Sequence, residues 1–142
     1  MVDIDGVLAN AAHRQHHLDS PWRNWDAFFS DADGDDVFVE TAVMLGLLDP
    51  DVAVVLLTSR PTWIQKITVE WLKKFHIRWD LLIMRPPGDY QPSPGFKRYE
   101  LLELQKIGYD VMLAIDDDMR NVRMYRNEGL PTLYLESGYH PH

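Results

Sequence analysis

The hexapeptide Val-Ala-Val-Val-Leu-Leu at positions 52–57 decides the fold class. All six residues are apolar, so both faces of the strand that they predict must be covered, as in a parallel sheet between two layers of helices. The polar residues Thr58, Ser59 and Arg60 follow directly. Polar side chains at the carboxyl end of such a strand lie where α/β proteins bind their ligands.

Shorter apolar runs predict four more strands, at residues 1–4, 81–84, 111–115 and 132–135. Between the strands, apolar residues with helical spacing predict helices at 36–47, 62–75, 96–107 and 118–128. We expect Thr62 and Asp118 to act as N-caps of the helices that they begin. The sequence therefore predicts an α/β protein of the Rossmann-like type, with a mostly parallel, five-stranded sheet flanked by helices.

The 142 residues suit one compact domain, and we predict a single domain over residues 1–142. Hydrophobic residues make up 46% of the chain, which is enough for a globular core. The formal net charge of −8 disfavours tight non-specific binding of nucleic acid, because such binding requires clustered lysine and arginine. Brief contact with a nucleic-acid end stays open.

The chain contains no cysteine, so disulfides and thiolate metal sites are excluded. No apolar run approaches the ~18 residues that a membrane span needs. The N-terminus lacks the basic and apolar pattern of a signal peptide. We therefore expect a cytoplasmic protein that does not enter a membrane.

Two long polar stretches, 9–35 and 85–95, interrupt the alternation of strands and helices. Loops of this length in a compact domain are often functional. We expect residues 3–35 and 85–95 to form the rim of the site, with a small cap domain over it or none.

Two groups of acidic residues follow predicted strands. Asp3 and Asp5 end the first strand, and Gly6 allows a bend that brings both carboxylates to the ligand crevice. There, one carboxylate can attack phosphorus while the other handles protons. Asp116 and Asp117 follow the strand at 111–115, and clustered carboxylates suit Mg²⁺. A plain turn at residues 3–6 and solvated acids at 116–117 are the alternatives.

Hydroxyl and basic residues complete a possible phosphate site. Thr58 and Arg60 at the end of the central strand are natural phosphate donors, and Lys97 begins the helix after the second polar stretch. Each alone is compatible with an ordinary surface residue. Their order along the chain, between the two acidic groups, gives them weight.

The chain resembles the haloacid-dehalogenase-like (HAD) phosphohydrolase superfamily. The four motifs of that superfamily are matched in order by Asp3 with Asp5, Thr58, Lys97, and Asp116 with Asp117. This resemblance spans almost the whole chain, and the ordered set of four is far more specific than any one motif.

Within that superfamily, the chain is similar to the 3′-phosphatase domain of phage-type polynucleotide kinase/phosphatases. Arg14 stands eleven residues after Asp3, and the Thr58-Ser59-Arg60 motif has a hydroxyl residue, a small residue and an arginine. Ser93 departs from the pattern, because that family tends to carry an acid one turn before the motif lysine.

The resemblance implies a Mg²⁺-dependent phosphomonoesterase that removes the 3′-phosphate from nucleic-acid ends. Asp3 would attack phosphorus to form an aspartyl-phosphate, and Asp5, with a raised pKa, would protonate the leaving group. Thr58 and Lys97 would bind the phosphate oxygens. The metal would be held by Asp3, Asp5 through its backbone carbonyl, Asp116 and Asp117, and the substrate by Arg14, Ser59 and Arg60.

Two other functions stay open. One is a small-molecule phosphatase with the same residues, similar to a 5′-nucleotidase and acting on a nucleotide. The other is a non-catalytic module that binds phosphate. The chain has no kinase P-loop, so a kinase or ligase partner would lie on another chain or domain.

Three further clusters carry less weight. Asp31, Asp33 and Asp35 hint at a calcium loop, which we reject because the sixth and twelfth positions hold Asp36 and Ala42. A zinc site at residues 13–17 lacks a second ligand cluster. The aromatic residues favour the packed face of a short helix over a platform for stacking bases, which stays open; they are Trp22, Trp25, Phe28 and Phe29.

Overall fold

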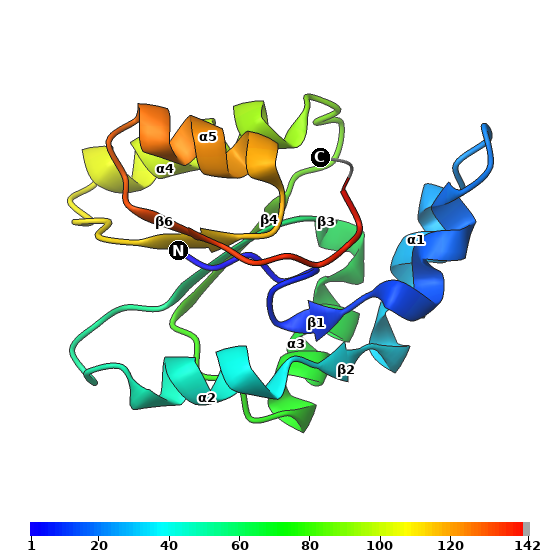
Figure 1. Ribbon diagram of the computed structural model, residues 1–142, viewed down its shortest axis with the longest axis horizontal. Coiled ribbons are helices and arrows are strands. Elements are labelled where there is room, and N and C mark those ends of the chain that lie inside the picture. Colours follow the sequence, from blue (N-terminus) through cyan, green and yellow to red (C-terminus); the bar gives the residue numbers. More distant parts are fainter. Residues whose placement is uncertain (141–142) are drawn as a thin grey trace.

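Parallel strands alternate with helices in the computed structural model, which describes residues 1–140 (Figure 1). The longer strands are β3 (Val55–Pro61), β4 (Leu81–Arg85), β5 (Ala114–Asp116) and β6 (Thr132–Tyr134). The helices that connect or flank them are α2 (Val39–Leu47), α3 (Gln65–Lys74), α4 (Ser93–Lys106) and α5 (Met119–Asn127). The predicted α/β class is therefore confirmed.

The sheet is less continuous than the sequence predicts. β3 pairs in parallel with β4, and β5 pairs in parallel with β6. The predicted strand at 1–4 is reduced to isolated parallel bridges from Val2 to Leu56 and Ile115, so residues 1–140 form short paired strands rather than a continuous five-stranded sheet. The cause is local, because the chain turns away after Asp3 and the Ile4 carbonyl accepts hydrogen bonds from the next turn.

The polar stretch at 9–35 is more ordered than a loop. It contains β1 (Ala9–Asn10), the 3₁₀ helices η1 (Ala12–Leu18) and η2 (Asp31–Gly34), and helix α1 (Trp25–Ser30). β1 pairs in antiparallel fashion with β2 (Asp36–Val37), which closes the stretch at its base. Figure 1 shows α1 at the edge of the molecule, and α1 contacts η1 and η2.

Three of the predicted helix starts differ from the structure. Helix α2 begins at Val39 rather than at residue 36, because Asp36 and Val37 form β2. Residues Thr62–Ile64 form a 3₁₀ turn, η3, so Thr62 is not the N-cap of α3, which begins at Gln65 without a side-chain cap. Helix α4 begins at Ser93 rather than Phe96, and Pro94 in its first turn suits a helix start. The Asp118 N-cap is confirmed, because its side chain accepts a hydrogen bond from the Arg120 amide.

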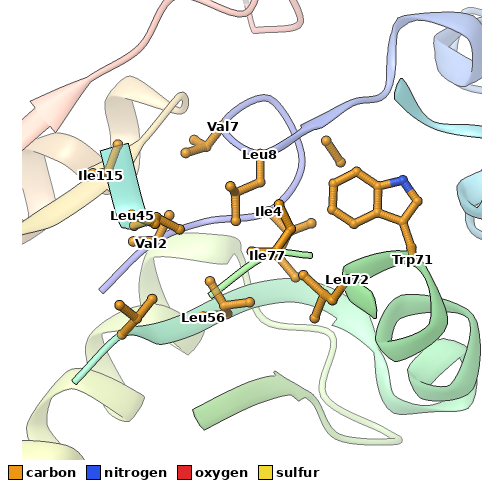
Figure 2. Packing of buried hydrophobic residues seen from close by; sticks show 12 residues of the cluster. Val2, Ile4, Val7, Leu8, Leu45, Leu56, Trp71, Leu72, Ile77 and Ile115 are labelled. Atoms are coloured by element: carbon orange, nitrogen blue, oxygen red, sulfur yellow. The ribbon is translucent and has the colours of Figure 1, made fainter. Parts of the chain in front are cut away.

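The main core lies between the N-terminal segment, β3 and helix α3 (Figure 2). Ile4, Leu56 and Leu72 are fully buried there, and Trp71 of α3 packs beside them. This packing fixes the segment that carries Asp3 and Asp5 against the sheet. Among residues 1–140, no helix combines the length and the apolar character needed to cross a bilayer.

Candidate active site

The predicted site residues converge at the carboxyl ends of the parallel strands. Thr58 lies on β3, Asp116 is the last residue of β5, and Asp3 directly follows the bridging residue Val2. The Asp3 amide donates to the Ile115 carbonyl at 3.0 Å, which places Asp3 beside the end of β5. All three side chains are buried.

A tight turn at Gly6 brings Asp5 back toward this edge. Gly6 has φ of +83°, a left-handed conformation that other residues adopt at a cost. A Cβ atom at Gly6 would also lie 2.0 Å from Oδ2 of Asp117. Glycine is therefore required at position 6 for two reasons. The turn needs a left-handed backbone conformation, and the Asp117 carboxylate lies too close to the backbone for a side chain.

We predict that Gly6→Ala lowers the free energy of unfolding by more than Gly129→Ala. Gly129 has a similar φ of +79°, but a Cβ there would meet no atom within 4 Å. The control thus carries the backbone strain of about 1 kcal/mol without the clash. Thermal or urea unfolding measures the difference, and phosphate release should fall only in Gly6→Ala. Equal effects of the two variants would contradict the proposed crowding at Asp117.

Three buried carboxylates form a cluster that suits a hard cation. One side-chain oxygen from each of Asp3, Asp116 and Asp117 lies within 4.8 Å of the other two. Oxygen ligands of this kind fit Mg²⁺. None of the histidines at 13–17 belongs to this cluster.

Lys97 provides the positive charge nearest to the cluster. Its Nζ lies 2.7 Å from Oδ2 of Asp116 and 3.2 Å from Oδ1 of Asp3. Burial works against its charge, but Asp116 and Asp3 outweigh burial and raise the pKa of Lys97. Burial raises the pKa of Asp3 well above its usual value, although Lys97 opposes that shift. Asp3 and Lys97 therefore lie close enough to act on one phosphate group.

Asp5 lies between two arginines rather than among the other acids. Arg14 Nη2 donates to its Oδ1 at 2.6 Å, and Arg60 Nη2 donates to the same oxygen at 2.7 Å. Burial favours the neutral form of Asp5, but Arg60 and Arg14 outweigh it and lower its pKa to about 2. The raised pKa that the sequence predicts is therefore wrong for this structure, because two guanidinium groups surround the carboxylate.

Arg14 and Arg60 themselves are fully buried. Both also contact Asp35, a buried residue at the end of η2 that our sequence analysis considered only within the rejected calcium loop. Their burial does not favour the direct contact with substrate that the resemblance implies. Their observed partners lie within the protein and include the carboxylates of Asp5 and Asp35.

The remaining predicted residues, Thr58 and Ser59, form hydrogen bonds with other groups of the protein. The Thr58 hydroxyl accepts from the Arg60 amide at 3.1 Å, and Ser59 Oγ lies 3.0 Å from Ser93 Oγ. Ser93, which departs from the family pattern, also accepts from Nδ2 of Asn121 at 3.2 Å. The same Nδ2 donates to Asp116 at 3.1 Å, so Asn121 is a neighbour of the cluster that sequence reasoning missed.

The family of the chain follows from a comparison with known proteins. The family model of the polynucleotide kinase PNKP phosphatase domain matches residues 1–140. The chain belongs to this family. The predicted resemblance to HAD phosphohydrolases, and to the phosphatase part of polynucleotide kinases, is thus confirmed. The α/β fold with parallel strand pairs is consistent with that family's Rossmann-like architecture.

Two solved structures are similar over most of the chain. One is the structure of the Pnkp1/Rnl/Hen1 RNA repair complex, at 29% identity and a TM-score of 0.77, covering 94% of this chain and 40% of that chain. Another structure of the Pnkp1/Rnl/Hen1 complex has 29% identity and a TM-score of 0.78, covering 94% and 44%. This chain thus spans less than half the length of these matched chains. No curated protein matches.

A C-terminal segment covers the acidic cluster of this PNKP-family phosphatase domain. Ser137 Oγ donates to Oδ2 of Asp117 at 2.5 Å, and His140 Nε2 lies 3.4 Å from the same oxygen. Both residues follow the last predicted strand, so no motif or period drew attention to them. These two contacts place the C-terminal segment beside the Asp117 carboxylate.

The aromatic residues near the site pack mainly against one another. Trp25 stacks on Phe29, and Phe28 meets both rings edge-on. Trp63 extends the cluster from the η3 turn after β3, with its ring 6.3 Å from that of Phe29. The packed helix that we favoured is therefore present, whereas Trp22 is 88% exposed and outside this packing.

Proposed function

We propose that this domain is a Mg²⁺-dependent phosphomonoesterase that removes 3′-phosphate groups from nucleic-acid ends through an aspartyl-phosphate. The observation that carries the proposal is the buried group of Asp3, Asp116, Asp117 and Lys97 at the strand ends. Membership of the PNKP phosphatase family supports the reaction class.

In the proposed first step, a carboxylate oxygen of Asp3 attacks phosphorus, and the bond from phosphorus to the 3′-oxygen breaks. Lys97 and Thr58 bind the non-bridging phosphate oxygens and stabilise their charge. In the second step, water attacks the phosphorus of the aspartyl-phosphate, which releases phosphate and restores the Asp3 carboxylate. Asp5 gives a proton to the leaving oxygen and regains one from the attacking water.

Mg²⁺ would be held by Asp3 and Asp116, with Asp117 beside them and the backbone carbonyl of Asp5 as a further ligand. Three buried acidic side chains with one lysine leave negative charge that a cation can offset. When bound, the metal supplies neutralisation of the phosphate charge, which would otherwise meet several carboxylates.

Because its pKa is low, Asp5 must acquire a proton before it can protonate the leaving group. In the free site, Arg60 and Arg14 keep this carboxyl ionised at neutral pH. A phosphate dianion bound beside Asp5 adds negative charge and raises its pKa, which favours the protonated form when the leaving group needs a proton. Asp5 therefore gains its proton with the substrate rather than holding one in advance.

The 3′-end of a polynucleotide is the proposed substrate, and a free nucleotide is the competing one. We expect kcat/KM for a 3′-phosphorylated oligonucleotide to exceed that for the matching 3′-nucleotide by about tenfold, from one or two added contacts. Added salt should reduce this advantage, because such contacts are partly exposed. Equal kcat/KM values would favour the nucleotidase instead.

A general phosphatase screen separates the catalytic function from mere phosphate binding. With Mg²⁺, we expect release of phosphate from an aryl phosphate as well as from the oligonucleotide. Binding of phosphate without turnover on any substrate would support the non-catalytic module. The similar chains in the Pnkp1/Rnl/Hen1 complex suggest, as a further proposal, that this single domain works beside a kinase or ligase activity.

A further inference from the structure

We infer that Asp35 is a positioning residue that acts on Asp5 through Arg14 and Arg60. The inference rests on the proposed function, in which Asp5 transfers protons, and it adds a residue that none of the recognised motifs contains. Asp35 lies thirty residues after Asp5 in the sequence, yet only one guanidinium group separates their carboxylates.

The two arginines connect the same pair of acids. Arg14 donates from Nε to Oδ1 of Asp35 at 2.8 Å and from Nη2 to its Oδ2 at 2.7 Å. Arg60 Nη2 donates to the same Oδ2 at 3.1 Å. The Nη2 atoms of both arginines also donate to Oδ1 of Asp5. Two positive and two negative groups thus form one closed network, which holds both guanidinium planes in place.

One member of the network, Asp5, is partly exposed to solvent. The side chains of Arg14, Arg60 and Asp35 are 0% exposed, whereas that of Asp5 is 22% exposed. A buried ion-pair network contributes little net stability, because desolvation offsets most of the attraction. Three members of the network are buried, and the fourth, Asp5, lies at the site. Control of Asp5 therefore explains the network better than a contribution to stability does.

The side chains of Trp71 and His13 hold Asp35 in this position. Trp71 Nε1 of helix α3 donates to the Asp35 carbonyl oxygen at 2.8 Å, and the Trp71 ring lies in the main core (Figure 2). His13 Nε2 lies 2.8 Å from Oδ1 of Asp35. Asp35 is therefore a fixed anchor, and the arginines transmit its position to Asp5.

Both arginines also have partners other than the carboxylates. Arg14 donates to the Phe28 carbonyl at 3.1 Å and stacks on the Phe28 ring, and Arg60 donates to the Thr68 hydroxyl at 3.2 Å. Among the described residues, their carboxylate partners are Asp5 and Asp35. Loss of the Asp35 charge would remove one of these two carboxylates, so that the guanidinium groups would be held less firmly and Asp5 would lose its fixed direction.

The test exploits the dependence of proton transfer on the leaving group. A nitrophenolate leaves without a proton, whereas the alkoxide of a 3′-nucleotide needs one. We expect Asp35→Asn to lower kcat at least about tenfold more for a 3′-phosphorylated oligonucleotide than for nitrophenyl phosphate. Asp33→Asn, an exposed change in η2, the 3₁₀ helix that directly precedes Asp35, should leave both rates unchanged.

Asp5→Asn, measured in parallel, separates the two ways in which the account can fail. If Asp5→Asn shows the selective loss but Asp35→Asn lowers both rates equally, or neither, the inference is overturned and the proposed function stands. If Asp5→Asn itself shows no selectivity, the proposed role of Asp5 is wrong. Should Asp35→Asn fail to fold, Trp71→Phe removes the hydrogen bond to the Asp35 carbonyl; a selective loss there supports the inference, and its absence contradicts it.

Discussion

Replacement of Asp3 with asparagine is expected to abolish turnover, with a fall in kcat on the order of 10⁴-fold or more. Asparagine has nearly the same shape as aspartate, but its amide is a far weaker nucleophile. The fold should survive, because Asp3 packs at the strand end without contributing to the apolar core. Phosphate release from an aryl phosphate and from the oligonucleotide measures the effect, and circular dichroism checks the fold.

Asp110→Asn serves as the matched control. Asp110 is exposed and lies in the irregular segment that precedes the amino end of β5. It should retain wild-type rates and stability. A folded Asp3→Asn variant with rates near those of Asp110→Asn would show that another group attacks phosphorus.

Removal of divalent metal is expected to have an effect of similar size. Activity should disappear in a chelator and return with Mg²⁺, because the phosphate would otherwise approach a cluster of buried carboxylates. Binding should also stabilise the fold: at about 100 times the dissociation constant it adds about 2.7 kcal/mol, a rise in Tm on the order of 5–10 °C. Differential scanning fluorimetry with and without Mg²⁺ measures this rise.

Asp116→Asn tests whether the acidic cluster is responsible. This variant should lose most of the Mg²⁺-dependent rise in Tm and require more Mg²⁺ for activity, whereas Asp110→Asn should respond as the wild type does. Full activity in the chelator, together with an unchanged melting curve, would refute a metal site at this cluster.

The positions of the strands along the chain, and the polar residues at their ends, could be predicted from the sequence because both depend on local pattern. The apolar run before Thr58 and the acids after residues 111–115 mark strand ends directly. Parallel strands bring such ends to one edge, so the proximity of Asp3 and Asp116 follows without any knowledge of side-chain packing. The position of Lys97 came from the family resemblance rather than from its surroundings in the sequence.

The partners of the buried arginines could not be predicted in this way. Arg14 and Arg60 look like residues that face a phosphate, and only the folded chain shows Asp35 beside them. Asp35 carries no signal of its own, because it lies in a run of acids and glycine that is typical of a solvated turn. The low pKa of Asp5 depends on this arrangement and was therefore missed as well.

Other differences have equally local causes. Residues 1–4 have the composition of a strand, but the turn around Gly6 ends the pairing after Asp3. Ser137 and His140 lie beyond the last strand, where no periodicity marks a functional segment, and their proximity to Asp117 depends on how the chain returns over the site. Long-range contacts of single polar side chains leave no trace in sequence periodicity.

The most direct test of the central claim is the partition of products in the presence of methanol. An aspartyl-phosphate at Asp3 transfers its phosphoryl group to water or to methanol after the leaving group has gone. The ratio of methyl phosphate to inorganic phosphate should then be the same for a 3′-phosphorylated oligonucleotide, a 3′-nucleotide and nitrophenyl phosphate. A ratio that changes with the leaving group, or an oligonucleotide that releases no phosphate, would contradict the account.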